Sequence, residues 1–121
     1  MKAIYKHAEK FLNTVDNFEK NYVGVDGKMV RSKDAIESLD ALLKKGLKLY
    51  NDVINEKVYE KFPILTVILN KIKEYADKLE NNEQTAKKLT MENALVIWQQ
   101  LEVALALLAS YIVDFLHAEG N

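Results

Sequence analysis

The sequence predicts an all-α fold, arranged as one antiparallel four-helix bundle that takes up residues 1–121 as a single domain. Four segments carry apolar residues at spacings of three and four, which is the period of a helix with one buried face. The stretches between them are short, and no internal repeat or second-domain linker interrupts the series. With 49% hydrophobic residues, four Gly and one Pro, the composition excludes disordered and collagen-like classes.

The first predicted helix spans residues 2–22. Its apolar stripe consists of Ile4, Ala8, Phe11, Val15, Phe18 and Tyr22. Lys2, Lys6 and Lys10 line a different, exposed face in the first turns, where the positive end of the helix dipole disfavours cations. We therefore treat these lysines as a candidate partner surface for an acidic group from a protein, an RNA phosphate or a neighbouring helix. An ordinary solvated face is the alternative.

Residues 23–31 interrupt the helical pattern. Asp26 and Gly27 sit between short apolar flanks, which is typical of a two-residue type I′ turn in a small β-hairpin. That turn requires a positive φ at Gly27, and we add Asp26 and Gly27 to the candidate partner surface. An irregular loop is the alternative, because isolated two-stranded hairpins are only marginally stable in water.

The second predicted helix spans residues 33–56. Its core stripe consists of Ile36, Leu39, Leu43, Leu47, Tyr50 and Ile54, and it is broadened by Leu42, Leu49 and Val53. The helix begins at Ser32 or Asp34, because either residue suits an N-cap. Gly46 lies inside the helix and has two explanations. Either the glycine simply costs the helix some stability, or it marks the close approach of a bulky neighbour.

The third and fourth predicted helices span residues 63–81 and 90–118. The third begins at Pro63, because proline suits the first turn of a helix and disfavours helical geometry just before itself. The polar residues 80–84 predict a turn. Thr90 then offers an N-cap hydroxyl to the last helix.

The last helix has apolar residues on two faces. Its core stripe consists of Ala94, Trp98, Leu101, Leu105, Leu108, Ile112 and Phe115. Its second surface carries Val96, Gln99, Val103, Ala106, Leu107, Ser110 and Val113. Two explanations stay open: the other three helices cover a central helix, or the second surface packs on another chain. We predict that this second surface is the interface of a two-fold homodimer.

Residues suited to catalysis or metal binding are scarce. The absence of Cys excludes disulfides, thiolate metal sites, iron–sulfur clusters and Cys nucleophiles. His7 and His117 are the only imidazoles, and no Glu-x-x-His motif accompanies them. The Ser and Thr candidates for a nucleophile lack a nearby His in sequence, and no phosphate-binding glycine loop is present. We therefore predict a protein that is not an enzyme, with no cofactor and no metal site.

The charge balance gives no overall attraction to polyanions or membranes. Seventeen basic residues against eighteen acidic ones leave a net charge of −1, and Arg31 is the single arginine, which makes nucleic-acid binding a secondary prediction. Residues 1–13 alternate Lys with apolar residues, unlike a signal peptide. The most apolar run, residues 103–113, is shorter than the ~20 residues that span a bilayer. We expect a cytoplasmic protein without a membrane span.

These observations predict a small non-enzymatic protein-interaction module, such as a regulator, adaptor, inhibitor or immunity-type protein. It is predicted to self-associate through its last helix and to bind a protein partner. Two alternatives stay open. One is a nucleic-acid-associated small subunit that uses the lysine-rich helix faces. The other is a carrier of a small apolar ligand held between helices.

Overall fold

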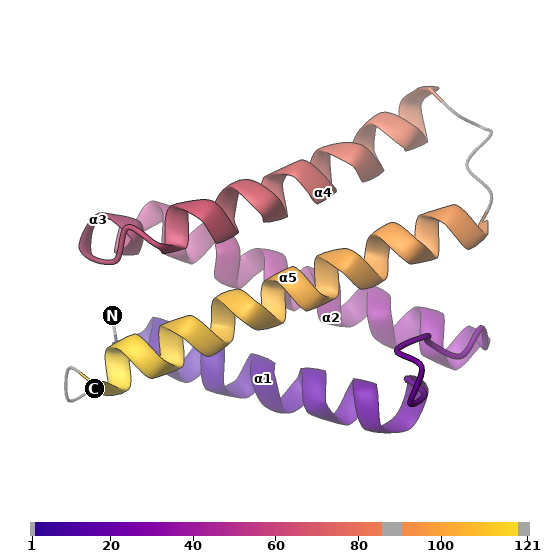
Figure 1. Cartoon of the computed structure of the whole chain (residues 1–121), viewed down its shortest axis with the longest axis horizontal. Helices are drawn as coiled ribbons and strands as arrows, with labels where there is room; N and C mark the ends of the chain where they lie inside the picture. Colours follow the sequence, from indigo (N-terminus) through magenta and orange to yellow (C-terminus); the bar gives the residue numbers. More distant parts are fainter. Residues whose placement is uncertain (1, 86–90, 119–121) are drawn as a thin grey trace.

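The structure, a computed structural model, describes residues 2–85 and 91–118 (Figure 1). In this part of the chain it contains α-helices and no strand. The helices are α1 (Lys2–Tyr22), α2 (Lys33–Asn55), α3 (Val58–Lys61), α4 (Leu65–Thr85) and α5 (Met91–Ala118). The all-α prediction is confirmed.

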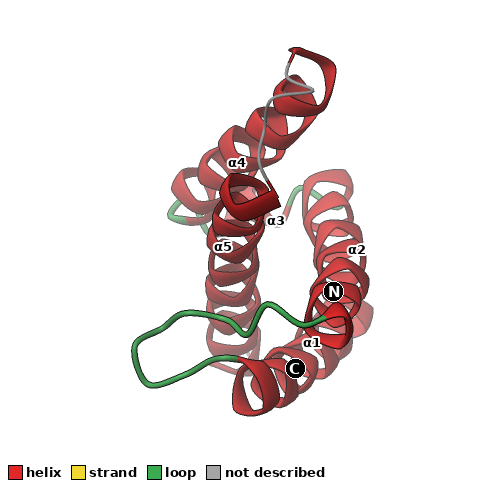
Figure 2. Cartoon of the chain, turned by 90° about the vertical axis from the view of Figure 1, so that its right-hand side faces the viewer, coloured by secondary structure: helices red, strands yellow, loops and turns green. Residues whose placement is uncertain are grey.

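The central helix is α5. It is packed by α1, α2 and α4, while α1 also packs on α2. The four long helices alternate in direction along the chain, so α2 and α5 run the same way (Figure 1). Figure 2 shows α5 between α4 and the pair formed by α1 and α2. A hollow of about 360 Å³ is lined by residues of α2, α3 and α4. The predicted four-helix bundle is not confirmed in its detail, because the described part has a short fifth helix and places one helix in the middle.

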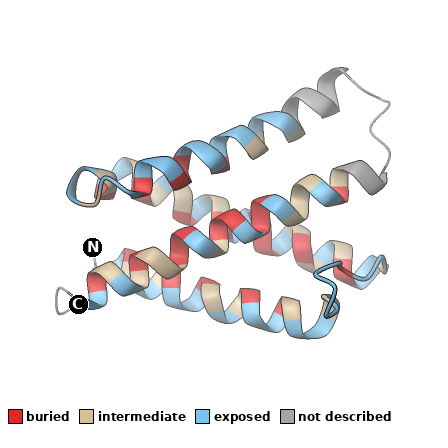
Figure 3. Cartoon of the chain, viewed as in Figure 1, coloured by how far each residue is buried: buried red, intermediate tan, exposed pale blue. Residues whose placement is uncertain are grey.

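The core follows the predicted apolar stripe in α1, but in α2 the buried face is rotated from the predicted stripe. Leu42, Leu49 and Val53 are buried, whereas Leu47, Tyr50 and Ile54 are only partly buried. Buried residues gather on the faces that the helices turn toward one another (Figure 3). Gly46 of α2 lies at a close contact with both α1 and α5. A Cβ added to Gly46 would lie 2.7 Å from Cζ of Phe11 and 2.6 Å from Cδ1 of Leu105. Of the two explanations for this glycine, close approach of a bulky neighbour is the correct one.

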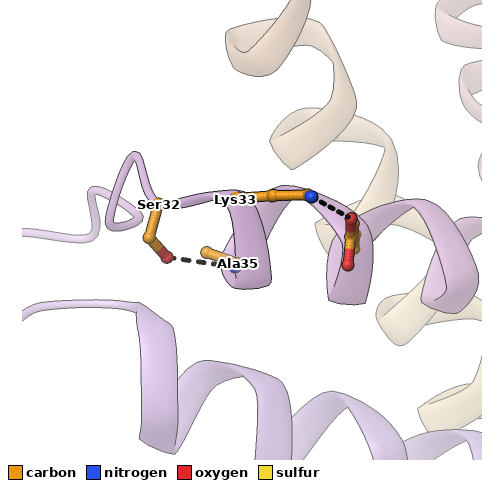
Figure 4. Close-up of polar contacts among 4 residues, drawn as sticks. Ser32, Lys33 and Ala35 are labelled. Atoms are coloured by element: carbon orange, nitrogen blue, oxygen red, sulfur yellow. Dashed lines mark hydrogen bonds and ion pairs between the residues drawn. The ribbon is translucent and has the colours of Figure 1, made fainter.

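Ser32 is the N-cap of α2, so of the two predicted candidates, Ser32 and Asp34, Ser32 is the correct one. Its Oγ accepts a hydrogen bond from the backbone N–H of Ala35 at 3.1 Å (Figure 4). This bond satisfies one of the N–H groups that have no partner in the first turn of a helix. The exposed ion pair in the same view joins Lys33 Nζ to Glu37 Oε1 at 3.9 Å.

The segment between α1 and α2 is a tight loop. The backbone N–H of Gly27 donates to the carbonyl of Gly24 at 3.0 Å, and the N–H of Gly24 donates to the carbonyl of Lys28 at 3.0 Å. The tip of the loop therefore consists of residues 25–27. Gly27 has a φ of 79°, so its predicted positive φ is confirmed.

The predicted type I′ hairpin is wrong in type and in extent. A type I′ turn needs positive φ at both central residues, and among the described residues Asp26 is not one of those with positive φ. The pattern is instead that of a three-residue loop in which the last residue, Gly27, is left-handed. Val23 and Met29 form one isolated antiparallel bridge rather than a pair of strands.

The short helix α3 lies in a segment where no helix was predicted. Lys57 adopts a left-handed conformation with φ of 53°, which ends α2 and turns the chain into α3. The ring of Phe62 then stacks on Phe115 of α5, with centroids 4.8 Å apart. A turn follows, closed by a hydrogen bond from the N–H of Leu65 to the carbonyl of Phe62 at 3.0 Å. The next helix therefore begins at Leu65 and not at Pro63.

The fourth helix in the chain is longer than predicted, because α4 continues to Thr85. The polar residues 80–84 were predicted to form a turn, but they are helical. Glu, Asn and Gln are polar without breaking a helix, and this stretch contains neither Gly nor Pro. Thr90, the predicted N-cap of the last helix, lies outside the described residues.

Candidate functional site

Exposed apolar residues form one stripe along α5. Val103 is 54% exposed, Leu107 is 47% exposed and Val96 is 46% exposed, although three other helices cover this helix. The three residues are separated by seven and four positions, so they project from the same side of the helix. We call Val96, Val103 and Leu107 the α5 stripe. An exposed aliphatic stripe on the central helix is a candidate docking face.

The other residues of the predicted interface flank the α5 stripe and are partly buried. They are Gln99, Ala106, Ser110 and Val113. The Nε2 group of Gln99 donates a hydrogen bond to the backbone carbonyl of Gly27. Asp26, next in the loop, accepts a hydrogen bond on Oδ1 from the backbone N–H of Lys28 at 3.0 Å. The structure therefore joins two predicted surfaces, because the loop of Asp26 and Gly27 is tied to α5.

A groove of about 550 Å³ lies at the N-terminal end of the α5 stripe. It is lined by Lys28, Arg31, Tyr75, Val96, Gln99, Gln100 and Val103. The loop between α1 and α2 contributes two cations to its wall. Tyr75 of α4 also lines it, with the ammonium groups of Lys71 and Lys78 lying 5.9 and 5.8 Å from the centre of the tyrosine ring. An apolar floor bordered by positive charge suits a surface that carries both apolar and acidic residues.

A second hollowed surface lies between α1 and α2. Lys6 and Lys10 of α1 line it together with Lys45 and Lys48 of α2. The two adjoining hollows have volumes of about 400 and 450 Å³. The packing of α1 on α2 therefore brings Lys6 and Lys10, which the sequence placed on one face of the first helix, to the same surface as Lys45 and Lys48. Lys2 is exposed but lines neither hollow.

The two histidines lie in different surroundings. Nδ1 of His7 lies 3.4 Å from Oδ2 of Asp52 on α2, which places a carboxylate on the lysine-rich surface. His117 is exposed near the end of α5. Within residues 2–85 and 91–118, no group of three His, Asp or Glu side chains is placed to hold a metal ion.

Glu102 of α5 is a buried carboxyl that the sequence did not single out. Its side chain is 0% exposed, and neither oxygen has a hydrogen-bond partner among the described residues. Burial, followed by the adjacent carboxyl of Glu19 on α1, raises the pKa of Glu102 to about 8. Two carboxylates close together repel each other, so one of the two carboxyls keeps its proton more readily, and burial favours the proton on Glu102. The signal in the sequence was only partial, because Trp98, Leu105 and Ala106 lie next to this position on the helix and place it at the border of the apolar face.

The length and composition of α5 also match those of a membrane-spanning helix. The segment Ala94–Ala118 is long and apolar enough to cross a bilayer, and it is the one such helix in the described part of the chain. The core helix of a globular protein has the same composition, and α1, α2 and α4 pack on this one. The absence of a membrane span stays a prediction.

Comparisons of the chain with protein-family models, with curated proteins and with solved structures found no match. The candidate docking face therefore rests on the geometry of this chain alone.

Proposed function

We propose that the protein is a small, non-enzymatic, cytoplasmic interaction module that self-associates through the α5 stripe. The observation that carries this proposal is the exposure of Val103 and Leu107 in the middle of the most apolar helix of the chain. The roles of regulator, adaptor, inhibitor or immunity-type protein all fit such a module, since each acts by contact rather than by chemistry.

The physical reason for association is the apolar area that α5 leaves exposed. Full burial of one Val or Leu side chain is worth about 1.5–3 kcal/mol, and these half-exposed residues would each gain roughly half of that. A two-fold contact uses the same residues on both chains, so the gain is doubled. Ala106 and Ser110 beside the stripe are small and permit close approach of two helices. Gln99 and Gln100 offer amide groups at the rim.

Sedimentation velocity of the wild-type chain and two variants tests the proposal. Leu107→Glu and Val103→Lys each place a charge in the α5 stripe, so we expect both variants to stay folded and to sediment as monomers. Val67→Lys is the matched control. Val67 of α4 is 67% exposed and lies outside the α5 stripe, so we expect this variant to dimerise like the wild type.

Two results would contradict self-association through this face. One is a wild-type chain that stays monomeric at every concentration up to the millimolar range. The other is equal weakening by Val67→Lys and Val103→Lys, which would make the effect one of added charge and not of position. Far-ultraviolet circular dichroism separates dissociation from unfolding, and Leu107→Ser replaces Leu107→Glu if the latter unfolds.

A second candidate function is nucleic-acid binding by the surface between α1 and α2. The observation that favours it is the gathering of Lys6, Lys10, Lys45 and Lys48 around two adjoining hollows. Phosphate contacts release counterions, so binding to duplex DNA or RNA would weaken steeply with salt. Binding that is insensitive to salt, or unchanged in a Lys10→Glu/Lys45→Glu variant, would exclude this candidate.

A third candidate, a carrier of a small apolar ligand, has less support. The groove of about 550 Å³ is bordered by the cationic residues Lys28 and Arg31, whereas a site for an apolar ligand is lined mainly by apolar side chains. Native mass spectrometry of the purified chain tests it, because a carrier would show a bound small molecule.

A further inference from the structure

We propose that the occupant of the α5 stripe is a second copy of the chain, packed antiparallel about a two-fold axis at the level of residue 105. In this arrangement Asp114 of each chain lies against Lys28 and Arg31 of the other. The proposal rests on the self-association proposed above and adds to it the direction and register of the two helices.

The spacing of the exposed residues is the first argument. Val96, Val103, Leu107 and Asp114 are exposed on α5 and are separated by seven, four and seven positions. At 3.6 residues per turn, all four lie within about 20° of one line along the helix. The order seven, four, seven is the same in both directions about residue 105.

This symmetry has a consequence for packing. If a second α5 is rotated about the midpoint, Val103 of each chain lies opposite Leu107 of the other, and Val96 lies opposite Asp114. The aliphatic residues then meet at the centre, and Gln100 of each chain lies near Ser110 of the other. A partner of different sequence would have no need for spacing that is symmetric in this way, which favours a second copy.

The charges at the two ends of the stripe are the second argument. Lys28 and Arg31 border the groove at the Val96 end, and Asp114 is exposed at the opposite end, about 27 Å along the helix. An antiparallel pair brings these unlike charges together twice. A parallel pair would instead set Asp114 beside Asp114 and Lys28 beside Lys28, and like charges at close range are unfavourable.

A charge exchange between two chains tests the register. Asp114→Lys places like charges at both ends of its own homodimer, and Lys28→Glu places a second carboxylate beside Asp114 at both ends while Arg31 keeps its charge. Each variant alone should dimerise about tenfold more weakly than the wild type. In an equal mixture, each heterodimer has two contacts of this kind. One joins the two substituted positions, 114 of one chain and 28 of the other, and the second joins the native Lys28 and Asp114. Both contacts pair unlike charges. We therefore expect the mixture to form heterodimers preferentially, with a Kd within about threefold of the wild type.

Sedimentation equilibrium gives the Kd values, and native mass spectrometry counts heterodimers, because the two variants differ in mass. The matched controls are Asp16→Lys and Lys45→Glu, which make the same charge changes at exposed positions that do not line the groove. Each control should dimerise like the wild type, and a mixture of the two should show no preference for heterodimers.

Two results overturn the proposal in distinguishable ways. If the wild type dimerises but the mixture of Asp114→Lys and Lys28→Glu associates no more tightly than either variant alone, the register is wrong and self-association stands. If the wild type is monomeric at all concentrations, self-association itself is wrong, and the register with it.

Discussion

The ring of Phe11 on α1 packs directly against Gly46 on α2, at the point where α5 also reaches the two helices. A Cβ on Gly46 would lie 2.7 Å from Cζ of Phe11, which is closer than carbon atoms approach without a shift. Leu105 of α5 closes the third side, with Cδ1 at 2.6 Å from the same position. The absence of a side chain at Gly46 therefore allows α1, α2 and α5 to pack closely at this point.

Gly46→Ala should destabilise the protein by about 1–2 kcal/mol. Alanine is the better helix former by about 1 kcal/mol, but overpacking of a core costs roughly 1–3 kcal/mol, and both Phe11 and Leu105 would have to shift to admit the added methyl group. Urea unfolding measures the change. The double variant Phe11→Leu/Gly46→Ala should lose less stability than the sum of its two single variants. An additive result, or a Gly46→Ala variant more stable than the wild type, would contradict the contact.

Gly27→Val should destabilise the loop by about 1–3 kcal/mol. The reason is backbone strain, because Gly27 has a φ of 79° and no atom lies within 4 Å of an added Cβ. Gly27→Asn is the control, since Asn adopts the left-handed backbone with little strain. This variant should lose much less stability than Gly27→Val. Thermal unfolding and amide exchange in residues 23–31 report the difference. Equal losses in the two variants would show that the side chain, and not φ, is responsible.

Stability should fall as the pH rises from about 5 to 8, because of Glu102. Burial, and then the Glu19 carboxyl, raises the pKa of Glu102 from 4.5 to about 8, so between these values the folded state holds a proton that the unfolded chain has released. Well below pH 4.5 the Glu102 carboxyl is protonated in both the folded and the unfolded chain, and well above pH 8 it is ionised in both. The stability therefore changes between these two pH values. The slope is at most about 1.4 kcal/mol per pH unit.

Urea unfolding of the wild type, Glu102→Gln and Glu19→Gln at several pH values measures this slope. Glu102→Gln should remove most of the slope and be more stable than the wild type at pH 8.5. Glu19→Gln should reduce the slope without removing it, since burial is the first cause of the shift. Wild-type and Glu102→Gln curves that stay parallel from pH 5 to 8.5 would show that Glu102 is charged in the folded state.

The long helices were predictable because apolar periodicity reports directly which face a helix buries. Phe11 and Val15 of α1 are buried as their spacing predicted, and Val103 and Leu107 of α5 are exposed on the surface predicted for them. Capping chemistry is equally local, so the sequence limited the start of α2 to Ser32 or Asp34, and the structure has Ser32.

Features that depend on contacts between distant segments were not predictable. The stack of Phe62 on Phe115 accompanies a four-residue helix that has no periodicity of its own. The burial of Glu102 depends on how α1 lies along α5, and a helix diagram of α5 alone shows the carboxyl only at the border of the apolar face. The meeting of Lys10 and Lys45 depends in the same way on the rotation of α1 and α2 about their axes.

The most direct test of the α5 contact is cross-linking between two single-cysteine chains. The sequence contains no Cys, so each introduced thiol is the only one. Helices packed at about 8–10 Å leave their facing α-carbons within the roughly 4.4–6.8 Å that a disulfide spans. Under mild oxidation, a mixture of Val103→Cys and Leu107→Cys chains should give mainly the mixed disulfide dimer, and Val67→Cys should give little. Chains that stay reduced and monomeric in the mixture, as in the Val67→Cys control, would contradict the account.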